Sequence, residues 1–372
     1  ADQVDSMMIS IAVPDTLMNV SNGQFKEKKK LGDGYTRYDW FVSYPINPYN
    51  VTLNIAKYAH FSAEEFPGEN GALAIDYYVL PENSSRAKQH FSENVPAMLN
   101  CFEHWFGPYP FYRDGYKLIE SSYLGMEHQS AIAYGNQYKN GYLGNDPSRT
   151  GYGMDWDFIV IHESGHEWFG NNITAKDIAD AWIHEGFTTY SEALFVECKH
   201  GKEAADAYLK GLRRSIQNTA PMVGTVGVND HSPTDMYYKG ANVLQTVRTV
   251  INDDEQWRHI LRGLNSKFGL KTVTTRDIVD YINEESGFNF TTIFNAYLLY
   301  PDIPVLEIRQ HLGKTEYRWN SKEQAFNLPI RVKSSDASKW EMLHPTSEWK
   351  MARNSGEFIV DTLTMYFNIE KI

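Results

Sequence analysis

One pentapeptide restricts this chain more than any other part of its sequence. Residues 162–166 read His-Glu-Ser-Gly-His, so His162 and His166 stand four residues apart. On an α-helix this spacing places two side chains on one face, about 6 Å apart along the axis. Two imidazoles and a carboxylate can hold Zn²⁺ and leave the fourth position open for water. Glu163 adjoins the pair, and its carboxylate can reach that water without binding the metal.

The residues before the pentapeptide favour a metal site over a pair of surface histidines. Asp155 can cap the start of a helix, and Phe158, Ile159 and Ile161 leave little of that helix facing water. A buried pair of histidines beside a glutamate is costly unless a partner compensates, and a metal ion is such a partner. The sequence therefore predicts a buried helix that binds Zn²⁺, with one ion per chain.

Length and composition allow several domains and exclude some classes of function. At 372 residues the chain exceeds one ordinary core, so we expect two or three domains. No apolar run approaches the roughly 20 residues of a membrane span. The net charge of −12 argues against nucleic acid as a partner, because no basic stripe is available for phosphate groups. Cys101 and Cys198 allow one disulfide, and the oligomeric state stays open.

The patterns along the chain divide it into three parts. Residues 1–80 contain alternating, strand-like runs between breakers and are typical of a partial β-domain. Residues 81–300 are mainly helical, beginning with a periodic segment at 84–106. Residues 301–372 alternate again and predict a small β-sandwich. The expected fold is α+β and multidomain, with a mainly helical domain flanked by β-domains.

Three local predictions concern the surroundings of the pentapeptide. We expect residues 116–123 to form an edge strand that leads into residues 124–128. A helix is predicted from about 180 to 201, and it carries Glu185. Thr275 is the expected cap of a later helix.

Glu185 extends the pentapeptide into a longer pattern. Eighteen residues separate His166 from Glu185. This spacing resembles the signature of the M1 family of zinc aminopeptidases, in which His-Glu-x-x-His is followed after the same interval by Glu. Residues 166–171 resemble the family's His-Gln-Trp-Phe-Gly-Asn run, with Glu167 in place of Gln. Residues 180–187 resemble its Asp-Leu-Trp-Leu-Asn-Glu-Gly-Phe run, with His in place of Asn.

Two further motifs resemble the same family. Residues 125–128, Gly-Met-Glu-His, resemble its Gly-x-Met-Glu-Asn exopeptidase motif, one residue shorter if Gly125 is the glycine. Aligned on Met-Glu, Leu124 takes the glycine position instead. Residues 237–240, Tyr-Tyr-Lys-Gly, resemble the run that carries the family's catalytic tyrosine. The motifs follow the family's order, and the resemblance is most detailed from 116 to 244.

The resemblance implies a thermolysin-like catalytic domain with a zinc centre and a base. His162, His166 and Glu185 would bind the ion, which would polarise the scissile carbonyl and lower the pKa of water from about 16 toward 7. Glu163 would take the proton from that water and pass it to the leaving amine. Glu192, two helical turns beyond Glu185, either orients a ligand histidine or faces solvent.

The same resemblance implies a site for the start of a peptide. Tyr237 would donate a hydrogen bond to the oxyanion of the tetrahedral intermediate. Glu127 would bind the free α-ammonium group, while Gly125 and Met126 would contact an extended peptide by strand addition. The implied reaction is hydrolysis of the N-terminal residue from peptides that have a free N-terminus.

Two other functions stay open on the sequence. The chain would be a gluzincin endopeptidase if an open cleft admitted longer peptides, and a catalytically silent binding module if the fold served only partner contact. The intact ligands, base and tyrosine argue against the silent module. We expect most of the family's N-terminal β-domain, and the large C-terminal helical domain of many members, to be absent from this chain. An extracytoplasmic location, periplasmic or secreted, is favoured over a cytoplasmic one.

Overall fold

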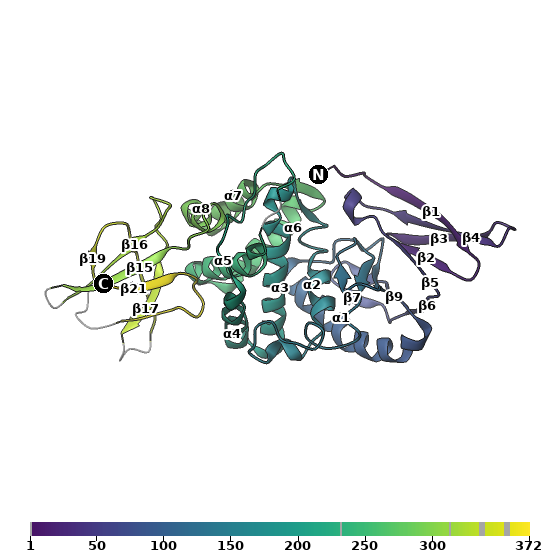
Figure 1. Cartoon of the computed structure of the whole chain (residues 1–372), viewed down its shortest axis with the longest axis horizontal. Coiled ribbons are helices and arrows are strands. Elements are labelled where there is room, and N and C mark those ends of the chain that lie inside the picture. Colours follow the sequence, from purple (N-terminus) through teal and green to yellow (C-terminus); the bar gives the residue numbers. More distant parts are fainter. Residues whose placement is uncertain (1, 231–232, 312–313, 335–338, 353–357) are drawn as a thin grey trace. The chain divides into compact units, whose positions relative to one another are not determined.

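The computed structural model of this chain describes residues 2–230, 233–311, 314–334, 339–352 and 358–372 (Figure 1). Ala1, where the expected N-terminal domain begins, lies outside the residues described. The chain divides into two units. Unit 1 comprises Ala1–Lys176, Ser191–Tyr208 and Leu261–Val273, and unit 2 comprises Asp177–Tyr190, Leu209–Ile260 and Thr274–Ile372.

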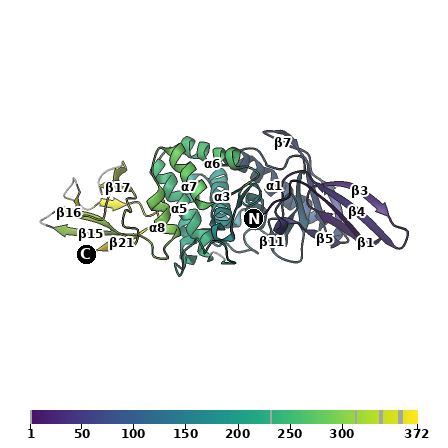
Figure 2. The ribbon, with the colours of Figure 1, turned by 90° about the horizontal axis from the view of Figure 1, so that it is seen from above.

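The first strands of unit 1 form a three-stranded antiparallel sheet. β4 (Tyr35–Val42) lies between β1 (Met7–Pro14) and β3 (Gln24–Lys30), as Figure 2 shows. Side chains alternate along β1, so that Ile9 and Val13 are buried while their neighbours are more exposed. The remaining short pairs are β2 (Met18–Ser21) with β5 (Leu53–Ala56), and β7 (Phe66–Gly68) with β8 (Gly71–Leu73).

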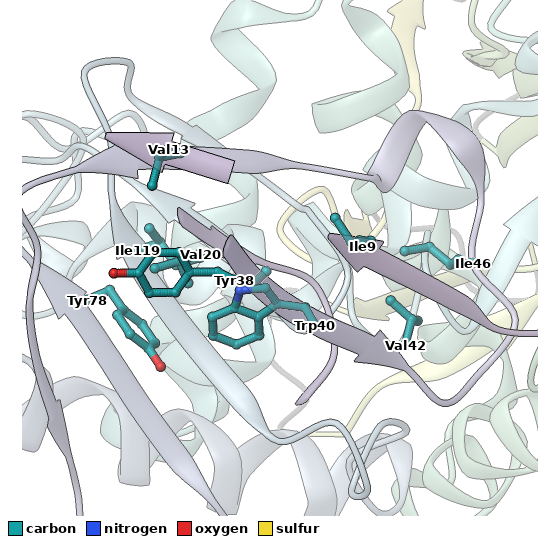
Figure 3. Packing of buried hydrophobic residues seen from close by; sticks show 10 residues of the cluster. Ile9, Val13, Val20, Tyr38, Trp40, Val42, Ile46, Tyr78 and Ile119 are labelled. Atoms are coloured by element: carbon teal, nitrogen blue, oxygen red, sulfur yellow. The ribbon is translucent and has the colours of Figure 1, made fainter. Parts of the chain in front are cut away.

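A hydrophobic cluster joins these strands to the next sheet of unit 1 (Figure 3). Trp40 lies at its centre, with its ring centroid 6.0 Å from that of Tyr78 in an edge-on contact. The indole N–H of Trp40 donates a hydrogen bond to the carbonyl of Asn19, which satisfies its one polar atom. The other labelled members are Ile9, Val13, Val20, Tyr38, Val42, Ile46 and Ile119.

The central sheet of unit 1 combines parallel and antiparallel strands. Its order is β11, β12, β10, β9, β6, and β9, β10 and β12 run parallel. Helix α1 connects β9 to β10, as a crossover between parallel strands requires. The bounds are β6 Ala59–Ser62, β9 Ile75–Val79, α1 Ser84–Phe106, β10 Tyr116–Glu120, β11 Gly125–Met126 and β12 Ile132–Tyr134. The helix predicted for residues 84–106 is thereby confirmed.

One edge strand of this sheet is β11, which pairs only with β12 among the described strands, and the other edge strand is β6. The prediction that residues 116–123 form the edge is wrong, because β10 lies between β9 and β12. All residues from Tyr116 to Ile119 are buried, as is typical of a strand inside a parallel sheet. Gly125 and Met126 therefore present the free edge.

Two helices position the pentapeptide and Glu185, with His166 as the C-cap residue of the first helix. They are α2 (Phe158–Gly165) and α3 (Trp182–His200), and α3 confirms the helix predicted for residues 180–201. Helices α3, α4 (Lys202–Leu212) and α6 (Asp254–Phe268) each contribute residues to both units. No helix in the described ranges is long and apolar enough to cross a membrane.

The rest of unit 2 consists of helices and two small sheets. Arg213 donates hydrogen bonds to the carbonyls of Thr362 and Met365, at 2.7 and 3.0 Å, and so holds the C-terminal segment. The strand orders are β19-β16-β15-β21 and β18-β17-β20. The bounds are α5 Asp235–Ile251, α7 Thr275–Ser286, α8 Thr291–Leu298, β15 Val305–His311, β16 Lys314–Asn320, β17 Ile330–Ser334, β18 Glu341–Leu343, β19 Lys350–Met351, β20 Phe358–Val360 and β21 Asn368–Lys371. A further pair in unit 1 joins β13 (Ile173–Ala175) to β14 (Lys271–Val273).

The cap of α7 lies one residue earlier than predicted. Thr274 and Asp277 form a capping box, in which each side chain accepts a hydrogen bond from the other residue's backbone N–H. The prediction of Thr275 as the cap is therefore wrong. The hydroxyl of Thr275 instead donates to Asp180 and accepts from the indole of Trp182, at 2.5 and 2.7 Å.

Cys101 on α1 and Cys198 on α3 form a disulfide within unit 1. Their Cα atoms lie 6.1 Å apart, and 97 positions separate them in the sequence. A link across so long a loop reduces the conformational freedom of the unfolded chain.

We expect the double variant Cys101→Ala, Cys198→Ala to have a free energy of unfolding lower by about 2–4 kcal/mol. Urea unfolding of both proteins, with and without reductant, measures this difference. Reductant should destabilise only the unmodified chain. An equal response of both proteins to reductant would contradict the structural role of this disulfide.

Candidate metal centre and active site

The helix that carries the pentapeptide starts at a buried aspartate. Asp157 caps α2, and its Oδ1 accepts hydrogen bonds from the backbone N–H groups of Ile159 and Val160, at 2.9 and 3.1 Å. The prediction that Asp155 is the cap is wrong, because Asp155 is exposed and lies two residues too early. The cap rule would have identified Asp157 had the helix start been placed at Phe158.

Three side chains from other elements fix the position of Asp157. The phenol of Tyr134 and the imidazole of His90 contact Oδ2 at 2.6 and 2.7 Å. The amide of Asn136 donates to Oδ1 at 2.9 Å. A fully buried carboxylate needs such donors, since burial without them is costly. The start of α2 is therefore held by hydrogen bonds to α1, β12 and the loop after β12.

The two histidines of the pentapeptide each engage Nδ1 with an acceptor. His162 Nδ1 lies 2.7 Å from Glu192 Oε1, and His166 Nδ1 lies 3.0 Å from the carbonyl oxygen of Phe169. A carbonyl oxygen and an ionised carboxylate can only accept, so both Nδ1 atoms carry the proton. Each Nε2 therefore keeps its lone pair, which is the form of histidine that binds a metal ion.

These histidines lie close to an acidic side chain that could complete a metal site. One ligand atom each of His162, His166 and Glu185 lies within 4.8 Å of the other two. Two imidazoles and one carboxylate are a donor set that suits zinc. The chemistry of these donors therefore fits the ion that the pentapeptide predicts.

Two further carboxylates, one on α2 and one just after β11, lie near His166. Glu127, Glu163 and His166 also have ligand atoms within 4.8 Å of one another, and Glu127 is half-buried while Glu163 is buried. A Cβ atom added to Gly125 would lie 2.6 Å from Glu163 Oε1 and 2.9 Å from Ile159. Only a glycine therefore allows β11 to approach α2 this closely without a shift.

Glu192 faces the interior and does not face solvent. Its side chain is fully buried, and its second oxygen, Oε2, accepts a hydrogen bond of 2.6 Å from the hydroxyl of Tyr208. This favours the first of the two predicted positions, in which Glu192 contacts a histidine of the pentapeptide. Sequence reasoning missed Tyr208, because no motif or spacing links α4 to this carboxylate.

Tyr237 lies in the first turn of α5, within unit 2. In that unit α5 contacts the first turns of α3 through two glycines. A Cβ atom on Gly240 would lie 2.9 Å from the Cα of Gly186, and one on Gly186 would lie 3.2 Å from the Cα of Gly240. This close approach fixes the distance between the helix segments that carry Glu185 and Tyr237.

Two ionisable side chains near the pentapeptide are strongly affected by burial. Burial raises the pKa of Glu167 to about 7, although its carboxylate accepts hydrogen bonds from Ser130 and Tyr109. Burial lowers the pKa of His128 to about 4. His128 Nδ1 has no hydrogen-bond partner within the described part of the chain, so His128 replaces the family's asparagine without a visible contact for this nitrogen.

Comparison with known families identifies the chain. The profile of the Peptidase family M1 domain matches residues 91–297, which are more than half of this chain. The chain belongs to peptidase family M1. The match contains every motif that indicates this resemblance, from Glu127 to Tyr237.

Curated relatives of this M1 chain are similar to it over a limited share of their own length. Glutamyl aminopeptidase of Mus musculus is 22% identical over 364 residues, which cover 89% of this chain and 37% of that protein. Aminopeptidase N of Lactobacillus delbrueckii subsp. lactis is 28% identical over 220 residues, which cover 53% and 25%. The chain spans about a third of the length of such relatives.

Solved M1 structures share the fold. The M1 zinc metallopeptidase from Deinococcus radiodurans aligns with a TM-score of 0.66 at 19% identity, covering 80% of this chain and 64% of that one. A mutant of that enzyme bound to a Tyr-Ser-Ala substrate aligns with a TM-score of 0.63 at 18% identity, covering 79% and 63%. The N-terminal strands and the helices of this chain are therefore those of an M1 peptidase fold.

With His162 as a predicted zinc ligand, we expect Glu192→Gln to weaken zinc binding by about 10- to 100-fold, because a neutral amide supports the imidazole less well than a carboxylate does. Competition with a zinc chelator measures the affinity. Glu203→Gln, at an exposed position on α4, is the matched control and should leave the affinity unchanged. Equal affinities for all three proteins would show that Glu192 does not support the metal.

Proposed function

We propose that this chain is the catalytic part of a zinc aminopeptidase that hydrolyses the N-terminal residue from peptides. One observation carries the proposal. Both histidines of the pentapeptide have Nδ1 engaged by a fixed acceptor, so both offer Nε2, and a pair of carboxylates lies beside His166. The names of the M1 relatives, which are aminopeptidases, support the same reaction.

In this proposal His162, His166 and Glu185 hold one Zn²⁺ ion. When bound, zinc supplies Lewis acidity toward the scissile carbonyl and makes water more acidic. Glu163 accepts a proton from the attacking water as its oxygen bonds to the carbonyl carbon. Glu163 then returns that proton to the nitrogen when the C–N bond breaks, so that an amino acid and a shortened peptide leave.

Glu127 is the group that makes the proposed reaction an exopeptidase reaction. Its carboxylate is close to Glu163 and His166, where a substrate's α-ammonium group would lie one residue from the bond that is cut. A charge at a fixed short distance favours a free N-terminus over an internal peptide segment. Gly125 and Met126 on the free edge of the sheet would pair with the substrate backbone.

Tyr237 is proposed to donate a hydrogen bond to the oxyanion that forms on the former carbonyl oxygen. Tyr237 lies in the first turn of α5 and is half-buried, which is compatible with contact between this residue and a ligand. A donor of this kind is typically worth about 3 kcal/mol in the transition state.

The proposed architecture refines the α+β fold into three domains. A thermolysin-like catalytic domain, residues 81–300, follows a partial N-terminal β-domain, residues 1–80. A C-terminal β-sandwich, residues 301–372, is supported by the two sheets at the end of the chain. The Cys101–Cys198 disulfide supports an extracytoplasmic location, since such bonds persist in oxidising compartments.

We expect Glu163→Gln to retain zinc and to lose about 10²- to 10⁴-fold in kcat, because glutamine cannot accept the proton. Elemental analysis of the purified protein and hydrolysis of an aminoacyl chromogenic amide measure the two properties. Treatment of the unmodified chain with a chelator should abolish activity, and added zinc should restore it. Loss of zinc from the Glu163→Gln protein would mean that Glu163 is not the base.

We expect acetylation of the substrate's amine to abolish cleavage, because Glu127 would then face a neutral amide. The same chromogenic amide, free and acetylated, gives the comparison. Glu127→Ala should lower kcat/KM for the free substrate while zinc stays bound. Equal rates on both substrates would indicate an endopeptidase, and absence of cleavage with zinc bound would indicate a silent binding module.

A further inference from the structure

The loop after β11 contains the proposed amine ligand and is held by side chains from distant elements. The carbonyl oxygen of Glu127 accepts a hydrogen bond of 2.8 Å from the amide Nδ2 of Asn171. Three residues on, the backbone N–H of Ser130 donates to Glu167 Oε1 at 2.9 Å. Asn171 and Glu167 both follow His166 closely in the sequence. These hydrogen bonds therefore hold the loop against the segment that follows α2.

The orientation of the Asn171 amide is determined by its partners. Nδ2 faces the Glu127 carbonyl and, at 3.3 Å, Glu167 Oε1, and both of these groups accept hydrogen bonds. Oδ1 faces the opposite way and accepts a hydrogen bond of 2.6 Å from Nδ2 of Asn50. Asn50 is fully buried and Asn171 is 1% exposed, so water does not replace either contact.

A second asparagine links the N-terminal strands to the same loop. Nδ2 of Asn22 donates to the carbonyl oxygens of Asn50 and Gln129, at 2.9 and 2.7 Å. Its Oδ1 accepts from the backbone N–H of Thr52 at 2.8 Å. Asn22 is fully buried. The N-terminal segment therefore reaches the Glu127 loop through the side chains of Asn22 and Asn50, which lie in the connections between its strands.

We infer that Asn50 and Asn171 are positioning residues for amine recognition, acting through the backbone of Glu127. Asn50 fixes which way the Asn171 amide points, and Asn171 then holds the Glu127 carbonyl in register with α2. The N-terminal β region thus sets the distance between the α-ammonium site and the metal. This inference rests on the proposed function, because it assumes that Glu127 binds the amine.

The hydrogen bonds from Asn50 to Asn171 and from Asn171 to the Glu127 carbonyl form a relay of amide side chains. Asn50→Asp tests this relay with almost no change in side-chain size. At a pH at which it is ionised, the new carboxylate faces Oδ1 of Asn171, an acceptor against an acceptor. If the Asn171 amide turned to donate to Asp, its oxygen would face the carbonyl of Glu127. Either arrangement breaks one hydrogen bond to a buried group and frees the Glu127 loop. Asn50→Ala, which removes the donor without adding charge, is made alongside in case the aspartate variant does not fold.

Asn47 offers a matched control three residues earlier. It is also an asparagine, it is 1% exposed, and its Nδ2 donates to Thr174 Oγ1 at 3.0 Å. Thr174 in turn donates to the backbone carbonyl of Gly170 at 2.8 Å and, more weakly, to that of Asn171 at 3.4 Å, so it meets the backbone of Asn171 and not its side-chain amide. Asn47→Asp and Asn47→Ala therefore disturb the same buried region while the side-chain hydrogen bonds of Asn171 to Asn50 and Glu127 stay in place.

The readouts are zinc content, kcat and KM for an aminoacyl chromogenic amide, and the preference for that amide over its acetylated form. We expect the Asn50 variants to raise KM and lower the preference by about tenfold, the effect of losing one hydrogen bond. Zinc content and kcat should stay within about twofold of the unmodified chain. The Asn47 variants should match the unmodified chain in KM and preference.

Two outcomes would overturn the inference. Equal changes of KM and of amine preference in the Asn47 and Asn50 variants would mean that Asn50 acts only through packing of the core. Loss of zinc or of kcat with an unchanged KM would mean that Asn50 acts on the metal helix and not on the amine site. Failure of the proposed function is distinguishable, because the unmodified chain itself would then show no preference for the free amine.

Discussion

A helix that is buried along its whole length must find a partner for every polar group that it carries. All eight residues of α2 are buried, and the helix contains an imidazole, a carboxylate and a hydroxyl. The surrounding chain supplies these partners from separate elements. Asp157 holds the first backbone N–H groups, Glu192 holds His162, and the phenol of Tyr116 lies 2.7 Å from the hydroxyl of Ser164. The surrounding elements thus satisfy the polar groups that burial of α2 removes from water.

The partners of α2 also restrict the chemistry of the metal centre. A carboxylate on one histidine and a backbone carbonyl on the other leave no freedom in the tautomers. The two acceptors differ in charge, so the Nε2 atoms of the two imidazoles are not equivalent. In the proposed metal centre, His162, which is paired with a carboxylate, would be the stronger electron donor of the two ligands. The protein therefore prepares an asymmetric pair of donors before any ion binds.

Sequence patterns predict the helix over residues 84–106 and the helical setting of the pentapeptide, because the signals for both are local. The helix over residues 84–106 agrees with its predicted bounds, since periodicity and a terminal glycine define it within a few turns. The caps at Asp157 and Thr274 were each misplaced by one or two residues, because neighbouring Asp and Thr residues compete for the same position. The cap is chosen by tertiary contacts, as those of Thr275 demonstrate.

Other features could not be read from one sequence. The composition of β10 suits an edge strand as well as a central strand. Only its pairing with both β9 and β12 shows that it is central. The contact of Asn50 with Asn171 joins residues 121 positions apart, and nothing in either local pattern indicates the other. The contact between Gly186 and Gly240 could not be predicted either, because close approach of two helices leaves no periodic signal in the sequence.

The disulfide between Cys101 and Cys198 has a topological consequence. The covalent loop that it closes encloses His162, His166, Glu185 and Glu192, together with Glu127. A single backbone cut anywhere inside that loop would leave two fragments still joined by a covalent bond. The proposed metal donors would then remain on one covalently linked molecule, whichever peptide bond in the loop had been hydrolysed. The disulfide thus protects the site against separation of its parts by another protease that cuts internal peptide bonds.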